Sequence, residues 1–316
     1  MHSTSGFATS RPVGESIDVS TAINLTLPPS ATTFETNLSN LPDASPNLLL
    51  TASTCVNVPR FQSLLAGYPS TLSDFLISGF SSGFRLGFLG QISTGREKNN
   101  LSAGKNIEAV SKAILKELNR GHSVGPFSSP PFQNFHCSPL GAVPKKDGST
   151  RIILDLSSPS GSSVNEGIPS EFFSVKYSSF DDAVSMVREV GRGCFMAKID
   201  IKHAFRIVPV HPNDWPLLGY KWLGRYFFDV RLPFASRSSP FIFNAFADSL
   251  AWILIHKFGI TSLMHYLDDF FCVHLRSLSV RGKSIWFCGS STTLVFQWRR
   301  ISSKVLLSVL FFLVLK

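Results

Sequence analysis

His265-Tyr266-Leu267-Asp268-Asp269-Phe270-Phe271 is the stretch that decides the fold. Its two adjacent carboxylates lie between two apolar runs, residues 260–267 and 270–273. An apolar run, a short polar pair and a second apolar run are typical of a β-hairpin, so we predict Asp268 and Asp269 at a tight turn. Adjacent like charges raise each other's pKa, and a cation between them removes that cost. Taken alone, the pair is more often a solvated acidic turn.

A third carboxylate upstream changes that balance. Asp200 lies at the C-terminal end of the apolar run 194–201, which predicts a buried strand. A carboxylate there is costly to bury without a partner. If this strand end lies beside the hairpin turn, Asp200 meets Asp268 and Asp269. Mg²⁺ prefers hard carboxylate oxygens and leaves room for substrate phosphates. Three carboxylates at one sheet edge therefore predict a site for two ions, about 3.5–4 Å apart, that activates a hydroxyl and stabilises a leaving pyrophosphate.

These residues resemble the palm of a reverse transcriptase. Asp200 matches the first catalytic Asp of that family, and residues 266–269 match its Tyr-x-Asp-Asp box. Phe205 matches the aromatic position that excludes a ribose 2′-OH and so selects deoxynucleotides. The amino-acid sequence of residues 200–212 is most similar to that of reverse transcriptases from retrotransposons of the tyrosine-recombinase (DIRS-like) type. The resemblance covers about 126–273.

The resemblance implies an RNA-directed DNA polymerase. Such an enzyme adds dNTPs to a primer 3′-OH on an RNA or DNA template by two-metal nucleotidyl transfer. Asp200, Asp268 and Asp269, assisted by the Ile201 carbonyl, are then the ligands of two Mg²⁺ ions, with Mn²⁺ as an alternative. The implied fold class is α+β, a polymerase fingers–palm with an antiparallel sheet backed by helices and no thumb.

Residues 140–156 predict a second hairpin, with an Asp-Gly turn between two strands. Lys145 and Lys146 precede this turn and Arg151 follows it. Cations at a hairpin tip hold a triphosphate by charge and by the guanidinium fork, although such a tip can also be simply solvated. In the family this hairpin is the fingers element that contacts the nucleotide phosphates. Arg151 matches the family Arg; Lys145 matches the Lys best, and a shorter turn keeps Lys146 a candidate.

Residues 232–240 match the next family motif, a loop that leads into a helix under the templating base pair. The resemblance therefore assigns Phe234 and Ala235 to the dNTP site. Reverse transcriptases usually have Gly where Ala235 stands, and Ala lacks the φ freedom of Gly, which puts the fine positioning of the nucleotide in question. Asp155 and Asn165 match a further family pair, which we interpret as scaffolding.

The rest of the chain divides by composition. Residues 1–47 are rich in Ser, Thr, Pro and Asn and predict a disordered extension. Residues 48–125 predict a helical lead-in, 126–273 the fingers and palm, and 274–316 a tail outside the family pattern. The helices expected from periodicity and caps lie at about 61–65, 72–76, 105–120, 179–190 and 241–258. Three further strands are expected at 206–210, 217–222 and 225–230.

Charge and cysteine content limit the class. The chain has 316 residues and a net charge of +9, but residues 1–269 hold 23 of its 30 basic residues and all 21 acidic ones. The basic surplus therefore lies mostly in the tail, and the case for nucleic acid rests on motifs. The five cysteines contain no Cys-x-x-Cys pair, which favours reduced thiols in the cytoplasm or nucleus. No charged segment precedes an apolar one at the N-terminus, so we expect no secretion.

The composition of the C-terminal tail, residues 274–316, leads to two hypotheses about its origin. Residues 270–316 contain no acidic residue, whereas helices normally use Asp and Glu in their first turns and in ion pairs. Our hypothesis is a frameshift or mispredicted exon after Val273, so that the product is truncated. A membrane-binding end is the alternative, but the apolar run 305–315 is too short to span about 30 Å at 1.5 Å per residue, and no stable membrane association is expected.

Two other functions stay open at this point. An inactive, truncated retroelement remnant with at most weak nucleic-acid binding is favoured by the missing thumb and the acid-free tail. A nucleotidyl cyclase can share a palm-like sheet and metal carboxylates, but the second hairpin and Phe205 argue against it.

Overall fold

The α+β class predicted from the sequence is confirmed. The computed structural model describes residues 38, 41–44, 53–92, 94, 98–145 and 148–274. Its α-helices are α2 (Val58–Leu64), α3 (Ser70–Ser82), α4 (Leu101–Gly104), α5 (Ile107–Asn119), α6 (Phe180–Val190), α7 (Ala204–Ile207) and α8 (Ser239–Phe258). Its strands are β1 (Ser123–Phe127), β2 (Leu140–Pro144), β3 (Thr150–Leu154), β4 (Phe195–Asp200), β5 (Gly219–Trp222), β6 (Arg225–Asp229), β7 (Leu263–Tyr266) and β8 (Asp269–His274). Short 3₁₀ helices occupy Val164–Gly167, Ser170–Phe172 and Pro212–Leu217.

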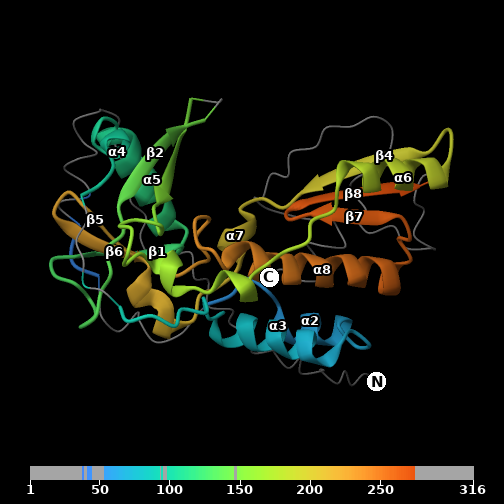
Figure 1. Cartoon of the computed structure of the whole chain (residues 1–316), viewed down its shortest axis with the longest axis horizontal. Coiled ribbons are helices and arrows are strands. Elements are labelled where there is room, and N and C mark those ends of the chain that lie inside the picture. The colour runs from blue at the N-terminus through green and yellow to red at the C-terminus, as the bar shows by residue number, and fades with distance from the viewer. Residues whose placement is uncertain are drawn as a thin grey trace, which may run out of the picture.

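The palm sheet has the strand order β4–β8–β7, and both of its pairings are antiparallel. Its strands alternate between two faces. Ile199 and Phe270 lie opposite each other on the buried face, whereas Lys198 and Phe271 lie on the other. Helix α8 runs along one side of this sheet and α6 lies on the opposite side (Figure 1). The predicted antiparallel sheet backed by helices is therefore present.

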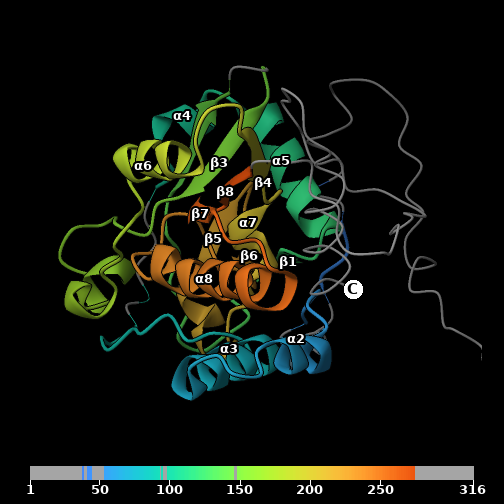
Figure 2. The same cartoon turned by 90° about the vertical axis from the view of Figure 1, so that its right-hand side faces the viewer.

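The remaining strands form two smaller sheets. Strands β2 and β3 pair antiparallel from Leu140↔Leu154 to Pro144↔Thr150, which confirms the hairpin expected over 140–156. The other sheet has the order β1–β6–β5. Helix α5 packs against β3 and β1, so it links the two smaller sheets (Figure 2).

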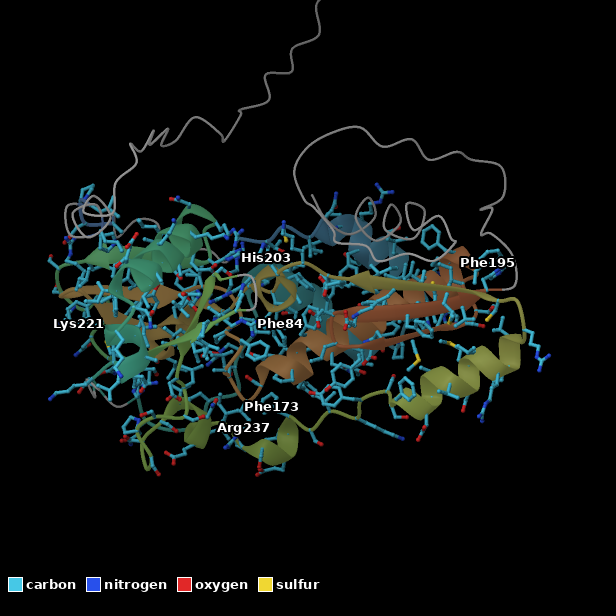
Figure 3. The ribbon with its side chains drawn as sticks, turned by 90° about the horizontal axis from the view of Figure 1, so that it is seen from above. Phe84, Phe173, Phe195, His203, Lys221 and Arg237 are labelled. Carbon is cyan, nitrogen blue, oxygen red and sulfur yellow. The ribbon has the colours of Figure 1, made fainter. Side chains whose placement is uncertain are left out.

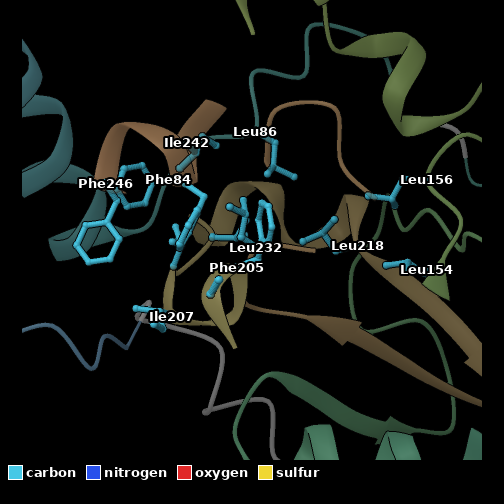
Figure 4. Close-up of a cluster of buried hydrophobic side chains, with 14 of the residues drawn as sticks. Phe84, Leu86, Leu154, Leu156, Phe205, Ile207, Leu218, Leu232, Ile242 and Phe246 are labelled. Atoms are coloured by element: carbon cyan, nitrogen blue, oxygen red, sulfur yellow. The ribbon is translucent and has the colours of Figure 1, made fainter. Parts of the chain in front are cut away.

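Aromatic packing holds α8 against the N-terminal helices. The rings of Phe61, Phe80 and Phe246 meet edge to face, with centroids 4.8–5.8 Å apart. Each such pair contributes about 0.5–1.5 kcal/mol beyond the burial of its area. Phe84, Ile242 and Phe246 belong to the same buried cluster (Figure 4). The core therefore continues from the lead-in helices to the palm.

Helix α8 is the one helix among the described residues that is long and apolar enough to cross a membrane. Half of its most apolar stretch is buried inside the fold. Ile242, Phe246, Leu250 and Ile253, the side chains expected to point inward, are all buried. This helix packs between α3 and β7, so its apolar character is that of a core helix.

One glycine fixes how α3 joins the palm. Gly83 ends α3 with φ 93°, a conformation that favours glycine. A Cβ at this position would lie 2.5 Å from the backbone nitrogen of His211. The Phe84 amide then donates to the Pro209 carbonyl at 2.9 Å, and the His211 amide donates to the Phe84 carbonyl at 2.9 Å. The close approach of these two backbones requires the absence of a side chain at residue 83.

Local signals predicted two helices well. Val110 and Ile114 are buried on α5, Leu118 is half-buried, and only Ile107 at the first position is exposed. Helix α6 begins with the expected capping box: the Asp182 amide donates to Ser179 Oγ, and the Ser179 amide donates to the Asp182 carboxylate. Such signals act within a few residues and do not depend on the rest of the fold.

The strand predicted over 206–210 is wrong. Residues 204–207 form the short helix α7, and only Pro209 and Val210 make isolated β-bridges, to Arg231 and Phe84. Strand propensity in this β-branched stretch is overridden because the chain must turn sharply after β4, with His203 at φ 61°. The strands predicted at 217–222 and 225–230 correspond to β5 and β6, with ends shifted by one or two residues.

Candidate active site

The three predicted carboxylates come together at one end of the palm sheet. Asp200 is the last residue of β4 and lies directly opposite Asp269, the first residue of β8. Residues directly opposite in an antiparallel pair have their side chains on the same face. The Ile201 amide donates to the Asp268 carbonyl at 3.0 Å, which holds the turn against the end of β4. Antiparallel pairing therefore brings together residues nearly seventy positions apart.

The turn lies one residue earlier than predicted. Leu267 and Asp268 form it, because Tyr266 pairs with Asp269 across β7 and β8. Leu267 adopts φ 52°, which costs a residue with a branched side chain about 1–2 kcal/mol. The expectation that Asp268 and Asp269 both form the turn is thus wrong. The register places Phe270 and Cys272 in the core, and this burial outweighs the strain at Leu267.

The carboxylates repel one another in the absence of a cation. Burial, and then the charge of Asp269, raise the pKa of Asp200 above its usual range. Burial, and then the charges of Asp200 and Asp269, raise the pKa of Asp268. Lys198 Nζ lies 2.8 Å from Asp269 Oδ2, and this hydrogen bond raises the pKa of the lysine. Lys198 was not predicted as a site residue; its position two residues before Asp200 puts it on the same face.

The end of the palm sheet gathers carboxylate oxygens, one of which has no hydrogen-bond partner. Asp269 Oδ1 is buried and has no hydrogen-bond partner. Carboxylate oxygens are the ligands that Mg²⁺ prefers, and a cation would satisfy this atom and remove the repulsion between the three acids. Over the described residues, however, no group of three or more His, Cys, Asp or Glu side chains is already arranged to hold an ion. Asp200, Asp268 and Asp269 offer oxygen ligands of the kind that Mg²⁺ prefers, and Lys198 is paired with Asp269 in this structure.

A cavity of about 1030 Å³ opens beside Asp268. It lies between α5, the β2–β3 hairpin and the segment that carries α7. Five predicted site residues line it together: Lys145, Arg151, Phe205, Phe234 and Asp268. Residues from positions 145 to 268 therefore line one cavity. Its volume is at the upper end of the range for small-molecule sites.

The other predicted residues lie elsewhere. Asp200, Ile201, Ala235 and Asp269 are described but do not line this cavity. Lys146 and the Asp of the hairpin turn fall outside the described residues, as does the segment 275–316. The break proposed after Val273 falls within β8, whose last residue, His274, pairs with Phe195. The boundaries of the predicted domains stay predictions.

Aromatic rings form one wall of the cavity. Phe205 is nearly buried and packs against Phe243 and Phe234, with ring centroids 5.1 and 5.4 Å apart. Phe234 is largely exposed, and the Arg151 guanidinium lies over its ring at 5.7 Å. This contact is within the range of a cation–π interaction. It fixes the β2–β3 hairpin tip relative to the loop at 234.

Asn165 anchors that loop from below. Its Nδ2 donates to the Ala235 carbonyl at 2.9 Å and to Ser157 Oγ at 2.8 Å, and its Oδ1 accepts from the Arg237 amide at 2.8 Å. These contacts support the scaffolding role expected for Asn165. Ala235 is not among the described residues with positive φ. The backbone therefore does not use the freedom that a glycine would provide here.

We expect Asn165→Ala to lower the free energy of unfolding by about 1–2 kcal/mol, because it leaves partly buried loop groups without hydrogen-bond partners. Urea denaturation followed by tryptophan fluorescence measures this change. Asn213→Ala, at an exposed position, is the matched control and should change stability by less than about 0.5 kcal/mol. Equal stability of the two variants would contradict the anchoring role.

Sequence reasoning missed the basic wall of the cavity. Lys112, Lys116 and Arg120 lie on α5 and at its C-terminal cap, and all three line the cavity. Their spacing of four residues was the available signal, because residues four apart share a helix face. His203 also lines the cavity, at the junction between the smaller sheets and the palm (Figure 3).

A partly buried ion-pair network at the cavity wall was also missed. Arg206 lies between Asp229, at 2.6 Å, and Glu117, at 3.4 Å. His122 Nδ1 lies 2.9 Å from Glu117 Oε2, and Ser123 Oγ donates to Asp229. The network joins α5, α7 and β6, so it holds the basic wall against the segment that follows Asp200.

The family comparison agrees with this geometry. Residues 143–281 match the family model of the reverse transcriptase (RNA-dependent DNA polymerase). Over this segment, which is less than half of the chain, the protein is similar to the reverse transcriptase domain at the level of the family. The segment begins within β2, contains β3, the β7–β8 hairpin and the three carboxylates, and ends slightly beyond Val273, where the resemblance seen in the sequence stopped.

Individual relatives come from foamy viruses. The Pro-Pol polyproteins of Simian foamy virus type 1 and type 3 (strain LK3) are each 26% identical over 137 residues, or 43% of this chain. The chain spans about a tenth of these relatives, 10% and 11%. Among solved structures, native prototype foamy virus protease-reverse transcriptase is 20% identical with a TM-score of 0.42, covering 76% of this chain and 32% of that one. A foamy viral protease-reverse transcriptase in complex with an RNA/DNA hybrid is 16% identical with a TM-score of 0.44, covering 79% and 30%.

Proposed function

We propose that this chain is the RNA-directed DNA polymerase domain of a retroelement of the tyrosine-recombinase (DIRS-like) type. It adds dNTPs to a primer 3′-OH on an RNA or DNA template. The observation that carries the proposal is the shared cavity: the cations of the β2–β3 hairpin line it together with Asp268 and Phe205. A triphosphate held by Lys145 and Arg151 would extend its sugar toward Phe205 and its α-phosphate toward Asp268.

The carboxylates are the proposed metal ligands. Asp200, Asp268 and Asp269, with the Ile201 carbonyl, would hold two Mg²⁺ ions or Mn²⁺ in their place. When bound, such ions lower the pKa of the primer hydroxyl and neutralise charge on the leaving pyrophosphate. The unpartnered Asp269 Oδ1 and the raised pKa values of Asp200 and Asp268 support this assignment. The protein's own contribution is to hold the reacting groups in line.

The remaining residues orient the nucleotide. Arg151 would bind the triphosphate with its guanidinium fork and Lys145 with its point charge, with Lys146 as the second candidate lysine. Phe205 would close the space beside the ribose 2′ carbon, so that a 2′-OH is excluded. Its packing against Phe243 holds the ring in place for this role. Phe234 and the Ala235 backbone would border the base.

The expected macromolecular partner is a template-primer duplex. Solved foamy viral enzymes are described in complex with double-stranded DNA and with an RNA/DNA hybrid. Because this chain spans only part of those proteins, the partner is proposed here by similarity. We further propose an intracellular location, in the cytoplasm or nucleus, without stable membrane association.

One observation favours an inactive remnant as the second candidate function. Lys198 is paired with Asp269, and the described carboxylates are not yet arranged as a three-ligand group. If Lys198 does not release Asp269 when metal is added, the domain binds nucleic acid weakly and does no chemistry.

Primer extension separates these two candidates. With poly-rA/oligo-dT and Mg²⁺, the proposed function predicts extension with dTTP, at least tenfold slower extension with UTP, and no extension with EDTA. A cyclase would convert a nucleotide without needing the primer. No extension by folded protein would reject present activity and favour the remnant.

A further inference from the structure

The exposed side of α5 is a cavity wall that the proposed polymerase site does not use. Its buried side packs on β1 and β3 through Val110 and Ile114. Lys112, Lys116 and Arg120 are exposed on the other side and line the cavity. With a rise of about 1.5 Å per residue, three cations spaced four apart follow about 12 Å of helix.

The charge of the cavity lining is strongly unbalanced. Seven basic side chains line the cavity against three acidic ones, Glu108, Glu117 and Asp268. Glu117 is already engaged by Arg206 and His122, and Arg120 lies 3.7 Å from its other carboxylate oxygen. Lys116 makes no ion pair within the part of the chain that the structure describes. A hollow lined by one sign of charge concentrates ligands of the opposite sign.

The α5 cations come from a different element of the cavity lining than the hairpin cations. Lys145 and Arg151 belong to the β2–β3 hairpin, whereas Arg120 follows the last turn of α5, close to His203 and the start of α7. At about 1030 Å³, the cavity can hold a nucleotide together with a second group of phosphates.

We propose that Lys112, Lys116 and Arg120 form a second phosphate-binding wall, which receives the polyphosphate that enters or leaves the site. This inference rests on the proposed function. In that reaction the primer oxygen bonds to the α-phosphorus, the bond between the α-phosphorus and its bridging oxygen breaks, and pyrophosphate leaves with the electron pair. The primer proton passes to water. The wall binds either the incoming triphosphate tail or the outgoing pyrophosphate.

The test uses the full chain and the double variant Lys112→Gln/Lys116→Gln. Both positions are exposed on a helix, and glutamine is a good helix former, so the fold should be unchanged by circular dichroism. Arg188→Gln/Arg192→Gln removes the same charge from exposed positions on and after α6, outside the cavity lining. Calorimetric titrations with inorganic pyrophosphate, with dTTP and with a DNA/RNA duplex are compared for the three proteins.

We expect the α5 variant to bind pyrophosphate about tenfold or more weakly, while the α6 control and duplex affinity stay unchanged. A larger loss for pyrophosphate than for dTTP identifies an exit path, and the reverse identifies an entry path. Pyrophosphate affinity within twofold of wild type overturns the inference, even if primer extension proves the proposed function. If the α5 variant loses affinity for the duplex but not for pyrophosphate, the inference is also overturned, because the wall then binds a nucleic-acid strand. A third outcome is that the wild-type protein extends no primer while the α5 variant still binds pyrophosphate more weakly than wild type. That outcome would refute the proposed polymerase function but not the phosphate-binding wall.

Discussion

Asp268→Asn/Asp269→Asn is expected to lower the rate of primer extension by at least about a thousandfold. Asn keeps the size of both side chains but removes two of the three negative charges that face each other at the end of β4 and β8. Without them, the site loses the charge that would hold two cations against the reacting phosphate. Single-turnover extension of oligo-dT on poly-rA measures the effect. Residual extension above about a tenth of the wild-type rate would refute the assignment.

The same site predicts a gain in stability that opposes the loss of activity. The pKa of Asp268 is raised in the fold, mainly by burial. A raised carboxyl pKa means that the folded state binds more protons than the unfolded state. Ionised Asp268 therefore lowers the stability of the fold, and this destabilisation is absent below the unfolded pKa near 3.8 and fully present above the folded pKa. At pH 7, Asp268→Asn should therefore raise Tm by up to about 2 °C in metal-free buffer.

Added Mg²⁺ provides the control for that result. We expect Mg²⁺ to raise the Tm of the wild-type protein, because an ion that binds only the folded state stabilises it. The gain should be smaller in Asp268→Asn and unchanged in Asp74→Asn, which alters an exposed acid on α3. Equal gains in all three proteins would mean that Mg²⁺ binds outside the palm.

Arg206→Met is expected to lower the free energy of unfolding by about 3–5 kcal/mol. Methionine fills much of the space of the arginine stem but leaves Glu117 and Asp229 without the cation between them. Removing the cation is costly mainly because Asp229, which is 4% exposed, stays desolvated, whereas Glu117 keeps His122 and Arg120 beside it. Urea denaturation gives the change, and Arg188→Met, at an exposed position on α6, is the matched control. A loss below about 1 kcal/mol would show that water replaces the guanidinium.

The stability of the fold should fall in acid because of the same ion-pair network. Burial acts to raise the pKa of Glu117, but the hydrogen bond from His122 and the charge of Arg206 outweigh it and hold the pKa below its usual 4.5. A depressed carboxyl pKa contributes stability that is present above 4.5 and is lost as pH falls through the folded pKa. In Arg206→Met this acid-dependent loss should be smaller, because one of the interactions that depress the pKa is already absent.

Several elements follow from the sequence alone because their signals are local. The hydrophobic period of α5, the capping box of α6 and the alternation in the two hairpins each act within a few residues. Asp200 and the Asp268–Asp269 pair could also be recognised, because a carboxylate in an apolar run is costly and therefore rare. From these residues came the class of the fold and the candidate catalytic acids.

Only the tertiary structure decided how these pieces meet. The turn shifted to Leu267 and Asp268 because the register that buries Phe270 and Cys272 outweighs a strained φ. A predicted strand became α7, and the basic side of α5 became a cavity wall. Each of these outcomes depends on contacts between residues far apart in the chain. Local propensities are worth at most about 1 kcal/mol per residue, so burial of the shared core determines them.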